Sequence, residues 1–184
     1  MPMIDVYAAA GTFADTHQLA VDLAAAVMRV EQVPDIPMFR QNTAAFVHEL
    51  PASSLANVDG DSSYVRVQVL TNAGALDRDK QLAVVEQLTG IISAAADDPG
   101  LADRTWVLLT EAPEGGWGLR GHANTNAELV ALARAQIAGA LYRDVGDGSR
   151  QRDPRRGNPP HLRNRSRSKT PALPALLSRF GHGC

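Results

Sequence analysis

The proline at position 2 combines an unusual place in the chain with a reactive group. It follows the initiator methionine and precedes MIDVYA, a short apolar run with β-branched residues that is typical of a strand. Proline has no backbone N–H for a sheet ladder and is normally kept out of strand interiors. Removal of Met1 would expose a secondary amine here, whereas a retained Met1 would leave a non-basic amide. A neutral amine in a dry pocket can take a proton from a carbon next to a carbonyl, so Pro2 is either a chance placement or the working group of the protein.

The composition describes an ordinary globular chain. It has 184 residues, of which 45% are hydrophobic and 5% aromatic, and no apolar run approaches the length of a membrane span. The N-terminus lacks a basic region followed by an apolar stretch, so we expect a cytoplasmic protein without membrane attachment. The single cysteine, Cys184, excludes an internal disulfide framework and a cysteine metal cluster. The sequence GWGLRG at 116–121 does not match a dinucleotide fingerprint, and we expect no cofactor and no metal.

Charge divides the chain into two parts. Residues 1–144 carry nine Lys and Arg against eighteen Asp and Glu, whereas residues 145–184 carry nine against two. The second part is rich in Arg, Pro, Gly and Ser without helical or strand periodicity, so we expect a disordered tail at 145–184. Its RNRSRSK run is compatible with nucleic-acid binding, but basic runs alone are poor predictors. A solvated tail is the favoured interpretation, and we expect no nucleic-acid partner.

An internal repeat organises residues 2–144. The segment GTFADTHQLAV, which starts at Gly11, recurs as GALDRDKQLAV from Gly74, and VHELP recurs as LTEAP about 62 residues later. Self-similarity of this kind indicates a duplicated supersecondary unit. We therefore predict two copies at about 2–61 and 64–122, followed by an added helix at 125–141.

Each copy is predicted to be a β-α-β unit. Strands are expected at MIDVYA, AAFVHEL, YVRVQVL and TWVLLTEA, and helices from Asp15 to about Glu31 and from Asp77 to about Ala95. Thr125 and Glu128 form a capping box ahead of the added helix, and the glycine-rich stretch 114–122 is a hairpin or loop. The predicted fold is α+β, with a four-stranded sheet and two helices on one face. The other face would be bare, so we expect oligomerisation to cover it.

The residue-2 proline, the duplication and the strand VLLTEA followed by PEGGWGLRG together resemble the tautomerase superfamily. The second copy resembles the C-terminal half of the 4-oxalocrotonate tautomerase monomer. The doubled arrangement, over about residues 2–122, resembles the fused members macrophage migration inhibitory factor, malonate semialdehyde decarboxylase and cis-3-chloroacrylic acid dehalogenase. The resemblance implies a homotrimer and a cofactor-independent isomerase in which Pro2, freed of Met1, is the general base for keto–enol proton transfer on a small keto or enol acid. It leaves two alternatives: a hydratase or decarboxylase of the same superfamily, with a protonated proline, and a non-catalytic trimeric scaffold.

Four further residues are candidates for substrate binding: Arg40, Asn72, Trp117 and Arg120. Trp117 aligns with the aromatic wall of the tautomerase pocket, and Asn72 lies in the turn of the second copy. Each also has a structural interpretation: a surface arginine, a turn asparagine and a tryptophan that fills a core gap. At positions where relatives carry the arginines that bind carboxylates, this sequence has Thr12, Ala44, Trp106, Asn72 and Ala75. The dehalogenase histidine and tyrosine are also unmatched, which disfavours dehalogenation.

Overall fold

The structure is a computed structural model that describes residues 1–148, with side chains described through residue 140. The predicted tail from residue 149 onward lies outside the described residues. The elements in chain order are β1 (Met3–Ala9), α1 (Thr16–Glu31), α2 (Pro37–Gln41), β2 (Ala44–Leu50), the 3-10 helix η1 (Ala52–Ser54), β3 (Val65–Asn72), α3 (Arg78–Ala95), the 3-10 helix η2 (Pro99–Arg104), β4 (Thr105–Ala112), β5 (Trp117–Leu119), β6 (His122–Asn124) and α4 (Asn126–Gly148).

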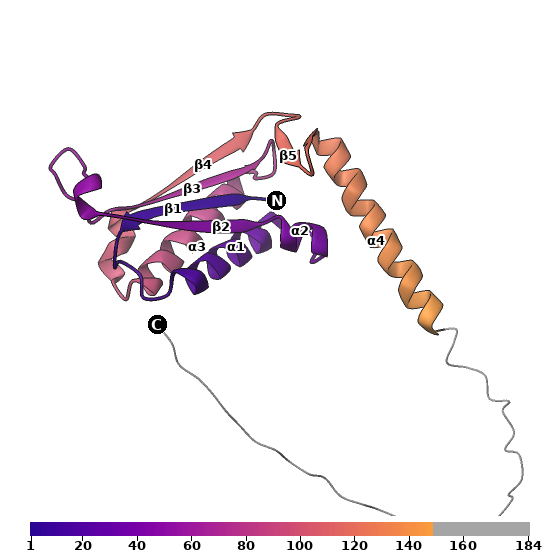
Figure 1. Ribbon diagram of the computed structural model, residues 1–184, viewed down its shortest axis with the longest axis horizontal. Helices are drawn as coiled ribbons and strands as arrows, with labels where there is room; N and C mark the ends of the chain where they lie inside the picture. Colours follow the sequence, from indigo (N-terminus) through magenta and orange to yellow (C-terminus); the bar gives the residue numbers. More distant parts are fainter. Residues whose placement is uncertain (149–184) are drawn as a thin grey trace, which may run out of the picture.

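The main sheet has four strands in the order β2-β1-β3-β4. The strands within each unit, β1 with β2 and β3 with β4, are parallel, and the two units meet through the antiparallel pair β1 and β3. Helices α1 and α3 pack against each other on one face of this sheet (Figure 1). The predicted α+β architecture of two β-α-β units is therefore confirmed.

Both main helices begin at the same kind of cap. Asp15 accepts a hydrogen bond from the backbone N–H of Gln18 at 2.8 Å, and Asp77 accepts one from the N–H of Lys80 at 2.9 Å. A side-chain oxygen at this position satisfies one of the N–H groups that the first helical turn leaves free. The helix starts predicted from the repeated sequence are thus correct.

The repeated glycine and glutamate contact each other in both units. The N–H of Gly11 donates to Glu49 at 3.0 Å, and the N–H of Gly74 donates to Glu111 at 3.0 Å. Both glycines adopt positive φ, at 84° and 70°, a region that L side chains rarely enter. The glycine forms the turn after the first strand, and the glutamate near the end of the second strand caps it, which explains why both were kept in the duplication.

The core lies between the sheet and the two helices. Alternate residues of β1 and β3 face it, including Ile4, Val6 and Val67, and all three are fully buried. Leu23 of α1 and Leu88 of α3 meet them from the helix layer, also without exposure. This arrangement follows from the period of two in strands and of 3.6 in helices. It anchors the start of β1 and with it the N-terminus.

The opposite face of the sheet carries large apolar side chains that none of the described helices covers. Phe46 of β2 is 50% exposed, and Trp106 and Leu108 of β4 are 47% and 45% exposed. Between them β1 and β3 present polar groups, of which Asp5 lies 2.7 Å from His48. This face, defined by Phe46, Trp106 and Leu108 and called the open face below, is the surface that the sequence predicted to be bare.

Two elements differ from the sequence-based expectation. The segment PMFRQ, for which the sequence predicted no element, forms the short helix α2, and Pro37 occupies its first position, where the missing N–H has no cost. The helix α4 begins with the predicted capping box, in which Glu128 accepts from the N–H of Thr125 at 2.7 Å. It runs to Gly148 rather than to about residue 141, so the first residues assigned to the tail continue the helix.

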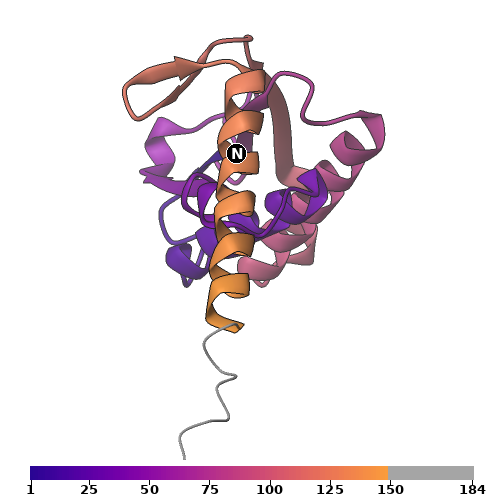
Figure 2. The same cartoon turned by 90° about the vertical axis from the view of Figure 1, so that its right-hand side faces the viewer.

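Helix α4 lies beside the end of the sheet where the chain begins (Figures 1 and 2). The hairpin of β5 and β6 leads into it, as expected for the glycine-rich stretch. Its residues Leu129 and Ala133 belong to a second apolar cluster with Met1, Met38 and Trp117. Among the described residues, no helix combines the length and hydropathy needed to cross a membrane.

Candidate active site

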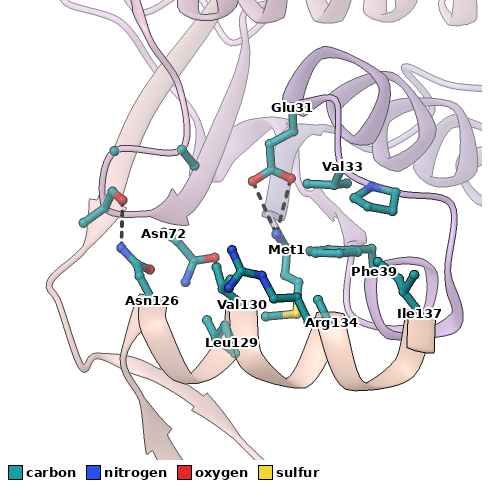
Figure 3. A pocket seen from close by; sticks show the side chains of 15 residues that line it. Met1, Glu31, Val33, Phe39, Asn72, Asn126, Leu129, Val130, Arg134 and Ile137 are labelled. Atoms are coloured by element: carbon teal, nitrogen blue, oxygen red, sulfur yellow. Dashed lines mark hydrogen bonds and ion pairs between the residues drawn. The ribbon is translucent and has the colours of Figure 1, made fainter. Parts of the chain in front are cut away.

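The N-terminus of the chain is buried beside a carboxylate. The ammonium of Met1 lies 3.3 Å from both carboxylate oxygens of Glu31, the last residue of α1 (Figure 3). The Met1 and Glu31 side chains are only 1% and 5% exposed. Pro2 is buried as well, and its carbonyl accepts a hydrogen bond from the N–H of Ala44 at 3.2 Å. The sheet therefore holds the start of β1 in a defined place.

Burial and the carboxylate act on this amine in opposite directions. Burial lowers the pKa of the Met1 ammonium from its ordinary value of 8.0, because a charged group loses hydration there. Glu31 raises the pKa through its charge and its hydrogen bonds, but burial dominates. An amine at this place is more readily neutral near pH 7 than an exposed terminus.

A cavity of about 370 Å³ opens next to the amine. Its wall is mainly apolar and comes from the segment after α1, from α2, from the turn after β3 and from α4, with Phe39, Leu129, Val130 and Ile137 among the lining residues. Cavities of this size with apolar walls and a few polar groups are typical of small-molecule sites. The molecule thus brings its N-terminus, three separate segments and the appended helix to one place.

Three polar side chains besides Glu31 line this cavity: Asn72, Asn126 and Arg134. Arg134 extends from α4 toward the side on which Asn72 lies (Figure 3). It is exposed, and within residues 1–140 no acidic side chain forms an ion pair with it. A guanidinium that no described acidic side chain neutralises, at the wall of an apolar cavity, is suited to a carboxylate or phosphate ligand.

Two hydrogen bonds, one at the start of α4 and one about three turns along it, hold this helix against the cavity. Asn126 donates to the carbonyl of Ala73 at 3.0 Å, and the N–H of Met38 donates to Gln136 at 2.9 Å. The first bond ties α4 to the turn after β3 and the second ties it to α2. Arg134 lies between these two attachment points along the helix.

The residues proposed from the sequence occupy different surroundings. Asn72 lines the cavity, and Trp117 is buried in the apolar cluster that contains Met1. Arg40 lies outside the cavity, where it pairs with Asp35 at 3.0 Å on an exposed surface. Arg120 is exposed in the turn between β5 and β6 with a φ of 55° and does not line the cavity. The structure brings Pro2, Asn72 and Trp117 to one region and leaves the two arginines away from it.

Sequence patterns did not single out Glu31 or Arg134. The signal for Glu31 is an acidic residue at the C-terminal end of a helix, where the helix dipole disfavours a negative charge. Arg134 lies in a helix that was predicted, but outside the repeat that directed attention to the site. No spacing rule links either residue to Pro2, because the contacts arise from the packing of α1 and α4 around the N-terminus.

Comparisons with solved structures identify the fold. The chain matches a crystal structure of native fused 4-OT with a TM-score of 0.55 and 20% identity, over 69% of this chain and 98% of the other. It matches a member of the cis-3-chloroacrylic acid dehalogenase family with a TM-score of 0.57 and 17% identity, over 79% and 99%. A structure of malonate semialdehyde decarboxylase matches with a TM-score of 0.51 and 16% identity, over 70% and 96%.

No protein-family model and no curated protein matches the sequence. The similarity to the solved structures is therefore one of three-dimensional arrangement, and it covers nearly the whole of each of them. The structure of this chain itself shows two β-α-β units, the strand order β2-β1-β3-β4 and a proline directly before β1. On these grounds the chain shares the fold of fused 4-OT and of the dehalogenase-family and decarboxylase structures.

Proposed function

We propose that the chain is a cofactor-independent tautomerase whose catalytic group is the amine of Pro2, exposed by removal of Met1. The observation that carries the proposal is the buried start of β1 beside an apolar cavity lined by Arg134, which forms no ion pair within residues 1–140. A site that lowers the pKa of an amine favours the neutral form that a general base requires. The solved structures of similar fold include enzymes, among them a dehalogenase-family member and a decarboxylase.

The proposed reaction moves one proton between oxygen and carbon. The lone pair of Pro2 takes the proton from the enol hydroxyl, the oxygen becomes a carbonyl, and the electron pair of the C=C bond moves to the neighbouring carbon. The ammonium of Pro2 then gives its proton to that carbon, which restores the neutral amine. No oxidant, metal or cofactor enters this balance.

The cavity favours a small acid with an apolar body. Phe39, Leu129 and Ile137 would pack against the apolar part, and Arg134 would bind the carboxylate with two parallel hydrogen bonds. Loss of Met1 would also free the space that its side chain fills in the apolar cluster with Trp117. Phenylenolpyruvate, which joins an aromatic ring to an enol acid, is a suitable test substrate.

Replacement of Arg134 tests the carboxylate contact. We expect Arg134→Gln to raise the KM for phenylenolpyruvate about tenfold to a hundredfold, since hydrogen bonds to charged groups contribute about 1.5–3 kcal/mol. Steady-state ketonisation kinetics measure this. Arg78→Gln at the exposed start of α3 is the matched control and should leave KM unchanged. An unchanged KM in the Arg134 variant would show that another group binds the carboxylate.

The state of the N-terminus separates the enzyme from a scaffold. We expect mass spectrometry of the purified chain to show Pro2 as the first residue, because a retained Met1 turns the proline nitrogen into a non-basic amide. The mass should fall short of the full sequence by one methionine residue. Retention of Met1 in the native protein would support the alternative of a non-catalytic trimeric scaffold.

We further propose that three copies associate through the open face. Structures of fused 4-OT of similar fold are described as symmetric and asymmetric trimers. The open face offers Phe46, Trp106 and Leu108, each about half exposed, and clusters of large apolar groups on a sheet face are typical of interfaces.

A second reaction class rests on Glu31. A carboxylate beside the amine favours the protonated form, and a protonated proline would suit hydration or decarboxylation. Product analysis with acetylenic and malonyl-type acids distinguishes these reactions from tautomerisation. Hydrated or decarboxylated products without enol ketonisation would favour this second class.

A further inference from the structure

We infer that Glu31 is the residue that orients the Pro2 amine and stabilises the charge it gains during proton transfer. This inference rests on the proposed function, because it assigns a role around the same amine. In the uncleaved chain both oxygens of Glu31 face the terminal ammonium, and nothing else among the described side chains donates to them. Glu31 is therefore a positioning residue for whichever amine ends the chain.

The carboxylate of Glu31 needs a cation at this place. It is buried, and it lies at the C-terminal end of α1, where the partial negative charge of the helix opposes it. A buried charge without a partner is strongly unfavourable. The Lys80 ammonium is close by, but it donates to the backbone carbonyl of Glu31 at 3.4 Å rather than to the carboxylate. The terminal amine is thus the counterion that makes this burial tolerable.

Removal of Met1 moves the terminus by one residue, about 3.8 Å along the chain. Pro2 itself stays in the sheet, because its carbonyl is bonded to the N–H of Ala44. The three rotatable bonds of Glu31 allow its carboxylate to follow the new terminus into the space that Met1 leaves. The ion pair of the uncleaved chain is then re-formed with Pro2.

The geometry of a secondary amine fixes how Pro2 is oriented when it contacts Glu31. Neutral Pro2 has one N–H and one lone pair, and an ionised carboxylate can only accept hydrogen bonds. When the N–H donates to Glu31, the lone pair points away from the carboxylate and is free to take a proton. When the amine takes a proton from the substrate, the new ammonium forms next to a negative charge. Preorganised charge of this kind stabilises the transition state.

The charged groups around the amine come from three helices. Glu31 of α1 faces it directly, Arg134 of α4 lines the same cavity, and Lys80 of α3 contacts the backbone of Glu31. Arg40 of α2 is turned outward to Asp35. Loss of the Glu31 charge leaves the cations unopposed, which favours the neutral amine.

The variant Glu31→Gln keeps a side-chain oxygen that can accept the amine N–H but removes the charge. We expect the pKa of the Pro2 amine, measured by nitrogen NMR, to fall, and the acidic limb of the kcat profile for phenylenolpyruvate to move to lower pH. The plateau of kcat should fall about a hundredfold, the scale of a lost electrostatic contact to the charge that develops in the transition state. Glu31→Asp, which keeps the charge, should restore the NMR titration toward that of the native chain. Glu86→Gln on the exposed face of α3 is the matched control.

The outcomes separate this inference from the proposed function. An unchanged amine pKa in Glu31→Gln overturns the inference, whether or not Pro2 is catalytic. A lowered pKa together with normal turnover of a Pro2 variant overturns the catalytic proposal but leaves the ion pair intact. A mature chain that retains Met1 overturns the inference for Pro2, since the carboxylate then keeps the partner seen here.

Discussion

Replacement of Pro2 by alanine is expected to lower kcat for phenylenolpyruvate ketonisation by about a hundredfold to ten-thousandfold, the range that general acid–base groups contribute. Alanine leaves a primary amine at the same place, but without the ring that holds the lone pair in one direction. The buried start of β1 and the adjoining cavity should remain, because the Pro2 contact with the sheet uses its carbonyl. Stopped-flow or steady-state absorbance of the enol measures the rate.

Pro51→Ala is the matched control for this variant. Pro51 is exposed before η1 and directly follows the end of β2, whereas the N-terminus lies beside the start of that strand. It lines no part of the cavity. Its replacement should leave kcat and KM at the native values. Equal turnover in the Pro2 variant and the native chain would refute the catalytic role of the amine.

If the chain forms the proposed trimer, replacement of Leu108 by aspartate is expected to convert it to monomers. Leu108 is 45% exposed in the single chain and lies on the open face of β4. In a trimer that buries this face, the new carboxylate would lose its hydration without a partner, which costs several kcal/mol at each of three equivalent contacts. Light scattering coupled to size exclusion should show the native mass fall to that of one chain.

Leu82→Asp provides the comparison for this change. Leu82 is 52% exposed on α3, on the helical side of the sheet and away from the open face. The same chemical change there should leave the mass of the assembly unaltered. A trimer that survives Leu108→Asp would place the subunit contact on another surface.

The sequence was sufficient for most of the fold because the determining signals are local. Asp15 and Asp77 cap their helices through bonds that span three residues, and Gly11 and Gly74 make turns that require positive φ. Alternation in the strands set which side chains enter the core. The duplication then related the two units, so that each supported the assignment of the other.

The short helix α2 and the full length of α4 could not be predicted from the sequence. The segment PMFRQ is only five residues long, too short to show a helical period, and the bond from Met38 to Gln136 that steadies it spans almost a hundred residues. At the end of α4 the glycine-rich and charged composition indicated a tail, although the helix continues to Gly148. Local composition could not reveal either outcome.

The sequence by itself determined the duplicated β-α-β fold, the bare sheet face and the place of Pro2 at the start of β1. Only the tertiary structure decided what surrounds that proline. Glu31 lies 29 residues from Pro2 along the chain and Arg134 lies far beyond it, and neither belongs to a spacing motif. They reach the N-terminus because α1 packs on the sheet and α4 folds back across its end. Contacts of this kind depend on how whole elements dock, and no local pattern in the chain encodes them.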